Sequence, residues 1–247
     1  MILGRLSRAI SRQDWSTVLI ELVVLVVGIF IGLQVDDWNN DRKDRSDEQR
    51  YLQRLHADVL LADELTRRVR DRLLGRLDAL NTASDLLFDR TDRDVLSDGE
   101  CIAVVASSII GSNAPRLAAF DELVGTGRLG IIRNSDLLGA LIGLEQFRAA
   151  LASQVSNLGG DGSMVYLPAV YPDLFQASTY TEADTGEIRL SAACDTASMK
   201  ADRAFLNQFT INADSYDVFI RDGLAPWNAQ FTKVHGLLDA LLGITHH

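Results

Sequence analysis

Glu21 is the residue whose chemistry most needs an explanation, because it is the one ionisable side chain inside the apolar run over residues 15–35. The run reads WSTVLIELVVLVVGIFIGLQV, and about 20 apolar residues in a helix cross the hydrocarbon core of a bilayer. A carboxyl group in hydrocarbon costs roughly 2.5 to 3.5 kcal/mol, and such groups usually face other protein. We therefore predict a transmembrane helix over 15–35 whose Glu21 face meets a partner.

The other residues on that face are Leu25, Gly28, Gly32 and Val35, all within about 40° of Glu21 at 100° per residue. Gly28 and Gly32 form a G-x-x-x-G step, which lets two helices approach closely. We predict self-association through this face, in which protonated Glu21 carboxyls hydrogen-bond to each other. The alternative is a lone glutamate that bends toward the headgroups and is partly hydrated.

Two tryptophans, Trp15 and Trp38, are expected at the membrane boundaries, where an indole ring is half in lipid and half in water. The tail over 1–14 carries three arginines, whereas the opposite flank begins with Asp36 and Asp37. Cations near the anchor favour the cytoplasm, so we place the tail there and the bulk of the chain outside. The apolar run is too long for a signal-peptide core, which indicates an uncleaved anchor.

The remaining residues that could do chemistry form weak patterns. His56 and His235 are single histidines on helical patterns, and we expect surface or core imidazoles rather than metal ligands. The run from Gly125 to Gly130 matches G-x-G-x-x-G, but it follows a helical segment, so a turn between helices is the better interpretation. Because no recognised catalytic motif is present, we predict no enzyme, no cofactor and no metal.

Cys101 and Cys194 are the two cysteines, an even number in a domain that we place in an oxidising compartment. This favours a disulfide, and two unrelated buried thiols are the alternative. The net charge of -10 argues against nucleic-acid binding, because past the stalk the basic residues are scattered among a larger number of acids.

The elements that position these residues are mostly helical. Apolar residues recur at helical spacing after the anchor, which predicts one continuous helix to about residue 88, with 36–90 as a stalk whose upper part packs in a bundle. Leu60, Leu65, Leu74 and Leu86 widen its apolar stripe and favour burial within the same chain. The fold class is mainly α, with an extracytoplasmic helical domain over 91–247.

Within that domain the sequence predicts a helix that begins at Asn134 or Ser135 and an extended link before it, over 128–132. Residues 164–193 are expected to be irregular, with one short helix or hairpin. A last helical region over 197–244 is predicted to break near Asn212 and again near Pro226, which lacks an N–H.

The anchor and the segment after it resemble an uncharacterised bacterial family of single-anchor membrane proteins. Glu21, Gly28, Gln34, Trp38 and Asn39 fall on the anchor motif of that family, and a looser second block matches at Leu123, Gly127, Leu129 and Ile132. The chain departs from the family at Asp36 and Asp37, where asparagine is commoner. The resemblance implies a single-pass protein of the inner membrane with its bulk in the periplasm, and it implies no activity.

Three functions fit this sequence. The first is a non-catalytic, oligomeric scaffold or binding module on a lipid anchor. The second is an accessory subunit of a proton-coupled membrane complex, which would use Glu21 and need a multi-span partner. The third is a membrane-tethered periplasmic enzyme whose site carries no recognisable motif.

Overall fold

The computed structural model describes residues 15–111, 114–160, 163–186 and 188–245. At Trp15 and Glu21 the backbone is helical, and their side chains lie outside the described part of the chain. The chain divides into two units, Met1–Tyr51 and Leu52–His247, which we describe separately.

Helix α2, Trp15–Leu87, contributes to both units and contains the continuous helix that the sequence predicts to about residue 88. No proline interrupts it, and it ends at a turn in which Asp89 adopts a positive φ of 55°. Among the described residues, α2 from Leu22 onward is the one helix long and apolar enough to cross a membrane.

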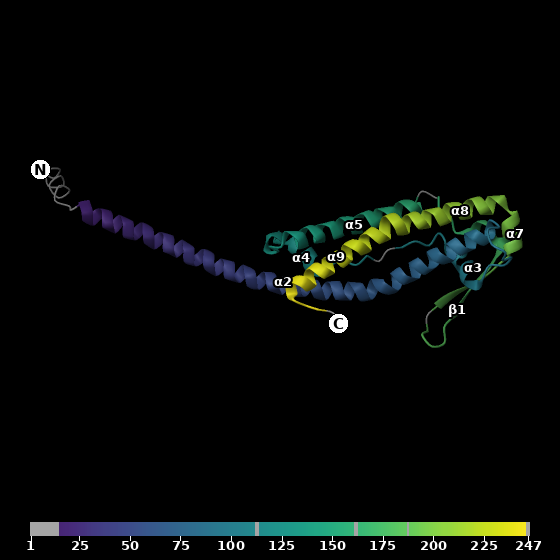
Figure 1. Ribbon diagram of the computed structural model, residues 1–247, viewed down its shortest axis with the longest axis horizontal. Helices are drawn as coiled ribbons and strands as arrows, with labels where there is room; N and C mark the ends of the chain where they lie inside the picture. Colours follow the sequence, from purple (N-terminus) through teal and green to yellow (C-terminus); the bar gives the residue numbers. More distant parts are fainter. Residues whose placement is uncertain (1–14, 112–113, 161–162, 187, 246–247) are drawn as a thin grey trace. The chain divides into compact units, whose positions relative to one another are not determined.

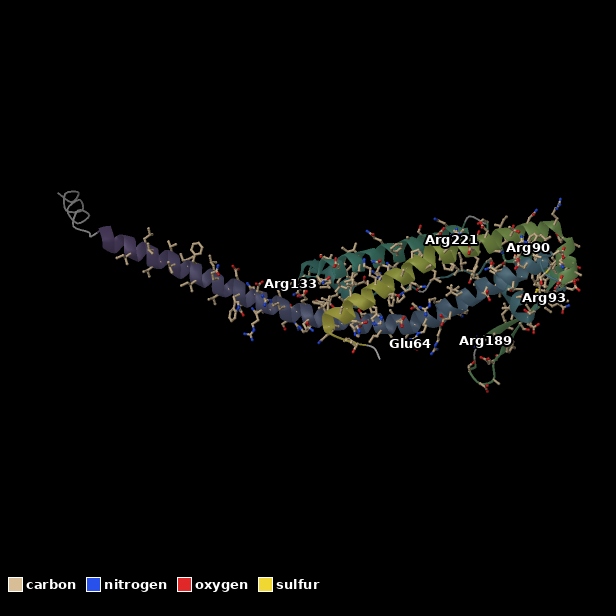
Figure 2. All side chains as sticks on the ribbon, viewed as in Figure 1. Glu64, Arg90, Arg93, Arg133, Arg189 and Arg221 are labelled. Atoms are coloured by element: carbon tan, nitrogen blue, oxygen red, sulfur yellow. A yellow bond between two sulfur atoms is a disulfide. The ribbon has the colours of Figure 1, made fainter. Side chains whose placement is uncertain are left out.

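In the first unit the apolar side chains of α2 are exposed, and they project from a single ribbon in Figure 2. Leu25 and Val35 are 59% and 58% exposed, and Phe30 is 63% exposed. A helical segment that is apolar on almost every side and exposed within its own unit, as residues 22–35 are in the described part of the chain, is typical of a membrane span.

The second unit contains the remaining elements. Figure 1 shows α5 running beside α9, with α8 continuing the line of α9 and the β1–β2 hairpin extending near α3. The elements after α2 are α3 (Asp98–Val105), α4 (Ala118–Gly125), η1 (Leu129–Ile131), α5 (Ser135–Gly160), α6 (Leu167–Val170), η2 (Pro172–Leu174), β1 (Phe175–Thr181), β2 (Ile188–Cys194), α7 (Thr196–Ala201), α8 (Arg203–Val218), η3 (Phe219–Leu224) and α9 (Ala225–Leu242).

The core of the second unit is built on a narrow stripe of α2. Leu55 and Val59 have no exposed surface, and Leu73, Leu80 and Leu87 are buried farther along the helix. The last third of the chain contributes fully buried aromatic side chains, among them Phe205, Phe209, Tyr216, Phe219 and Trp227. The Tyr216 hydroxyl donates a hydrogen bond of 3.2 Å to the Leu73 carbonyl, which fixes α8 against α2.

The buried stripe is narrower than the sequence predicts. Leu86 is buried, but Leu60, Leu65 and Leu74 are 43%, 59% and 45% exposed, so the expected wide contact is wrong at these three positions. Each of the three directly neighbours a buried residue, Val59, Thr66 or Leu73, and therefore lies about 100° round the helix from it.

Residues 164–193 contain both a short helix, α6, and an antiparallel hairpin in which Phe175 pairs with Cys194 and Thr181 with Ile188. Cys101 and Cys194 form a disulfide with their Cα atoms 5.8 Å apart, and this bond joins strand β2 to helix α3. The hairpin is therefore covalently attached to the helical core at its base.

The predicted break near Asn212 is wrong, because α8 continues through this residue. The buried Asn212 amide donates to Ser107 Oγ at 2.9 Å and to the Val165 carbonyl at 2.8 Å, and its oxygen accepts from the Val165 N–H at 3.2 Å. A polar side chain inside the helix thus serves tertiary contacts instead of ending the helix.

Two further details differ from the sequence predictions. The irregularity before Pro226 is a π-helical turn, η3, that leads without interruption into α9. The link before α5 is a 3₁₀ turn, η1, rather than an extended segment. Asn134 does cap α5, since its side-chain oxygen accepts the Leu137 N–H at 2.8 Å.

Candidate functional site

The face predicted on the anchor lies in the first unit. Leu25 and Val35 are exposed, and a Cβ atom added at Gly28 or Gly32 would meet nothing within 4 Å. The Glu21 side chain lies outside the described residues, as does that of Trp15. Trp38 is 67% exposed, as an indole at a membrane boundary would be in the absence of lipid.

A second group of functional side chains lies in the second unit and was missed at the sequence level. His56 on α2 and His235 and Asp239 on α9 place one metal-ligating atom each within 4.8 Å of the other two. His56 Nε2 lies 2.9 Å from Asp239 Oδ1, and His235 Nε2 lies 3.6 Å from Asp239 Oδ2. The carboxylate therefore stands between two imidazoles.

The three side chains are held by the packing of two helices. His56 follows Leu55 and is one turn from Val59, and both of these neighbours are fully buried. On α9, His235 follows Val234 and Asp239 follows Leu238, again two fully buried residues. Each polar side chain thus borders the apolar contact, with side-chain exposures of 11% for His56, 22% for His235 and 18% for Asp239.

The sequence interpretation took His56 and His235 as single histidines with no ligand at i+4, and this premise is wrong for His235. Asp239 stands four residues after His235, on the same face of a helix, and this spacing was the available signal. His56 lies 183 residues before Asp239, so no spacing in the sequence could join it to the other two.

An ion pair, Arg93–Glu100, lies at the end of the second unit that contains α3 and α7, where Figure 2 labels Arg93. Arg93 Nη1 donates to Glu100 Oε1 at 2.8 Å, and the Ser97 N–H donates to Glu100 Oε2 at 2.7 Å. The hydrogen bond from Arg93 is the main reason that the pKa of Glu100 falls to about 2, against the opposing effect of burial. Ser97 and Glu100 form a capping box at the start of α3, and Arg93 pairs with the carboxylate of that box.

The interior of the second unit also holds a small cavity of about 20 Å³ lined mainly by apolar side chains, including Leu73, Leu151 and Trp227. A space of this size accommodates one water molecule. It is too small for an organic substrate.

The G-x-G-x-x-G match ends helix α4, as a turn between helices should. Gly127 has a φ of 68°, and the Arg128 N–H donates to the Leu123 carbonyl at 2.9 Å. A left-handed glycine directly after a helix lets the following backbone N–H groups bond to the last carbonyls of that helix.

Comparisons with protein-family models, curated proteins and solved structures give no match to this chain.

Proposed function

We propose that the chain is a single-pass membrane protein whose anchor self-associates and presents the second unit as a non-catalytic scaffold or binding module outside the cytoplasm. The observation that carries this proposal is the exposure of the apolar side chains of α2 over 22–35, within the described part of the first unit. Lipid and a second helix are the two environments that satisfy such a surface.

Self-association is assigned to the face of Gly28 and Gly32. Both positions have space for a neighbouring backbone, since nothing lies within 4 Å of a Cβ built at either glycine. The opposite face carries Phe30, a bulky side chain suited to lipid. The helix therefore has one face for a partner helix and one for the bilayer.

Crosslinking of introduced cysteines in native membranes tests this proposal. Gly28→Cys should give a disulfide-linked dimer, and Phe30→Cys, about 180° round the helix from Glu21, should give little. Equal crosslinking at both positions, or a single-chain mass for the wild-type protein in nanodiscs, would overturn the proposal.

Substitution of the acid separates hydrogen bonding from simple burial. Glu21→Gln should keep the dimer, because the amide still donates and accepts, whereas Glu21→Leu should weaken it. Co-purification of a multi-span protein that depends on Glu21, with no homodimer, would instead favour the accessory subunit of a proton-coupled complex.

A further inference from the structure

We propose that His56, His235 and Asp239 bind one transition-metal dication of the zinc class. Two imidazoles and one carboxylate form a ligand set that Zn²⁺ accepts, with metal–ligand bonds of about 2.0 to 2.2 Å. This inference is independent of self-association, because all three residues belong to the second unit.

The spacing of the ligand atoms suits a single ion. Tetrahedral ligands at such bond lengths lie about 3.3 to 3.5 Å apart. One ligand atom from each residue lies within 4.8 Å of the other two. His56 Nε2 is 2.9 Å from Asp239 Oδ1 and His235 Nε2 is 3.6 Å from Asp239 Oδ2, so the two imidazoles approach different oxygens of one carboxylate, and rotation of that carboxylate can bring one oxygen between them.

The type of ligand disfavours Ca²⁺ and Mg²⁺ at this site. Ca²⁺ and Mg²⁺ prefer sets composed of oxygen atoms, whereas imidazole nitrogen favours zinc, copper, nickel and iron. The carboxylate adds a negative charge that offsets the charge of the ion at a site that is mostly shielded from water.

The ion would join two elements that are distant in the sequence. His56 lies in the first turns of α2 that belong to the second unit, and the other two ligands lie near the end of α9. His56 Nε2 lies 2.9 Å from Asp239 Oδ1, and a carboxylate can only accept, so a hydrogen bond here uses the tautomer with its proton on Nε2. Coordination through that nitrogen displaces this proton, so the ion replaces a hydrogen bond between α2 and α9 with a stronger cross-link.

The test uses the full chain in mild detergent with His246→Asn and His247→Asn, which remove the other two of its four histidines. ZnCl₂ is titrated against a chromophoric chelator, and one ion should bind per chain. Asp239→Asn should weaken the affinity roughly 100-fold, since the amide keeps the shape but loses the charge and most of the ligand strength.

Asp63→Asn, which alters an exposed acid two turns after His56 on the same helix, is the matched control and should leave the affinity unchanged. Wild-type affinity in Asp239→Asn, or binding well below one ion per chain, would overturn the proposal.

A second measurement requires no change at the site. In the same two-histidine background, the ¹⁵N-imidazole resonances belong to His56 and His235 alone. Both should shift to metal-bound positions on addition of one equivalent of ZnCl₂. Shifts of neither histidine, or of one histidine only, would show that the cluster is a structural hydrogen-bonded group.

Discussion

Helix α2 carries two apolar segments, over 22–35 and from residue 51 onward, and the apolar side chains of the two segments differ in exposure. Before Tyr51, residues such as Leu33 are more than half exposed, and after Leu52 the residues of one stripe, such as Leu55, are fully buried. Over 22–35 the helix is apolar on almost every side, whereas after residue 51 it has an apolar face and a charged face. The distribution of apolar residues round a helix, more than their number, thus indicates whether its partner is the surrounding medium or its own chain.

Truncation of one leucine in each part tests this difference most strongly. Leu55→Ala should lower the free energy of unfolding of the second unit by about 3 kcal/mol, because it leaves a cavity in a closely packed core. Leu33→Ala removes the same atoms from an exposed position and should leave that free energy within about 0.5 kcal/mol of wild type. Urea unfolding in detergent, followed by near-UV circular dichroism, measures both, and equal losses would contradict the contrast.

The ion pair between Arg93 and the buried Glu100 should make the stability of the second unit depend on pH. The pKa of Glu100 is about 2 in the folded chain, below its ordinary value of 4.5, so its stabilising effect is present above about pH 4.5 and is lost as the pH falls toward 2. Glu100→Gln should cost about 2 kcal/mol at neutral pH, allowing for solvent screening at the half-exposed Arg93, and little at pH 2. Unfolding midpoints at several pH values provide the test; a constant difference would reject this origin.

Glycine substitutions sharpen the contrast further. At Gly223, in η3, an added Cβ would collide with the Gln154 and Leu151 side chains of α5, so Gly223→Ala should destabilise the second unit by roughly 1 to 3 kcal/mol. Gly28→Ala meets no neighbour within 4 Å and should leave the second unit unaffected. Thermal unfolding of both variants in one detergent measures the difference, and a tolerated alanine at 223 would mean that α5 and η3 separate easily.

The smallest effect is expected for the exposed ion pair between Arg54 on α2 and Glu122 on α4. Their side chains are 50% and 40% exposed, so a double-mutant cycle with Arg54→Ala and Glu122→Ala should give a coupling below about 1 kcal/mol that falls as salt is added. A larger, salt-independent coupling would show that this pair is shielded in solution.

Much of this architecture could be predicted from local patterns. The length and continuity of α2, the cap at Asn134 and the turn at Gly127 depend on neighbouring residues, and the sequence displays these directly. The error at Asn212 arose because an amide inside a helix suggests a break locally, while its actual partners, Ser107 and Val165, are 105 and 47 residues away.

The His56 cluster could not be predicted for the same reason. The spacing of His235 and Asp239 is visible in the local sequence, but the third residue, His56, comes close to them only because α9 packs against α2. That packing depends on the buried surfaces of many residues at once, which no short pattern encodes.

The π-helical turn Phe219–Leu224 explains how one long helical region keeps its buried side inward. Up to the first residue of the turn the buried side chains are at 205, 209, 212, 216 and 219, and from its second residue onward they are at 220, 224, 227, 231, 234 and 238, with Gly223 also buried inside the turn. The second series repeats the first with an offset of one residue, which is the extra residue that a π turn adds. Deletion of one residue here would turn α9 by about 100° and carry Trp227, His235 and Asp239 out of phase with α2. A single inserted residue in evolution would thus have brought the C-terminal helix into register with the core and with His56.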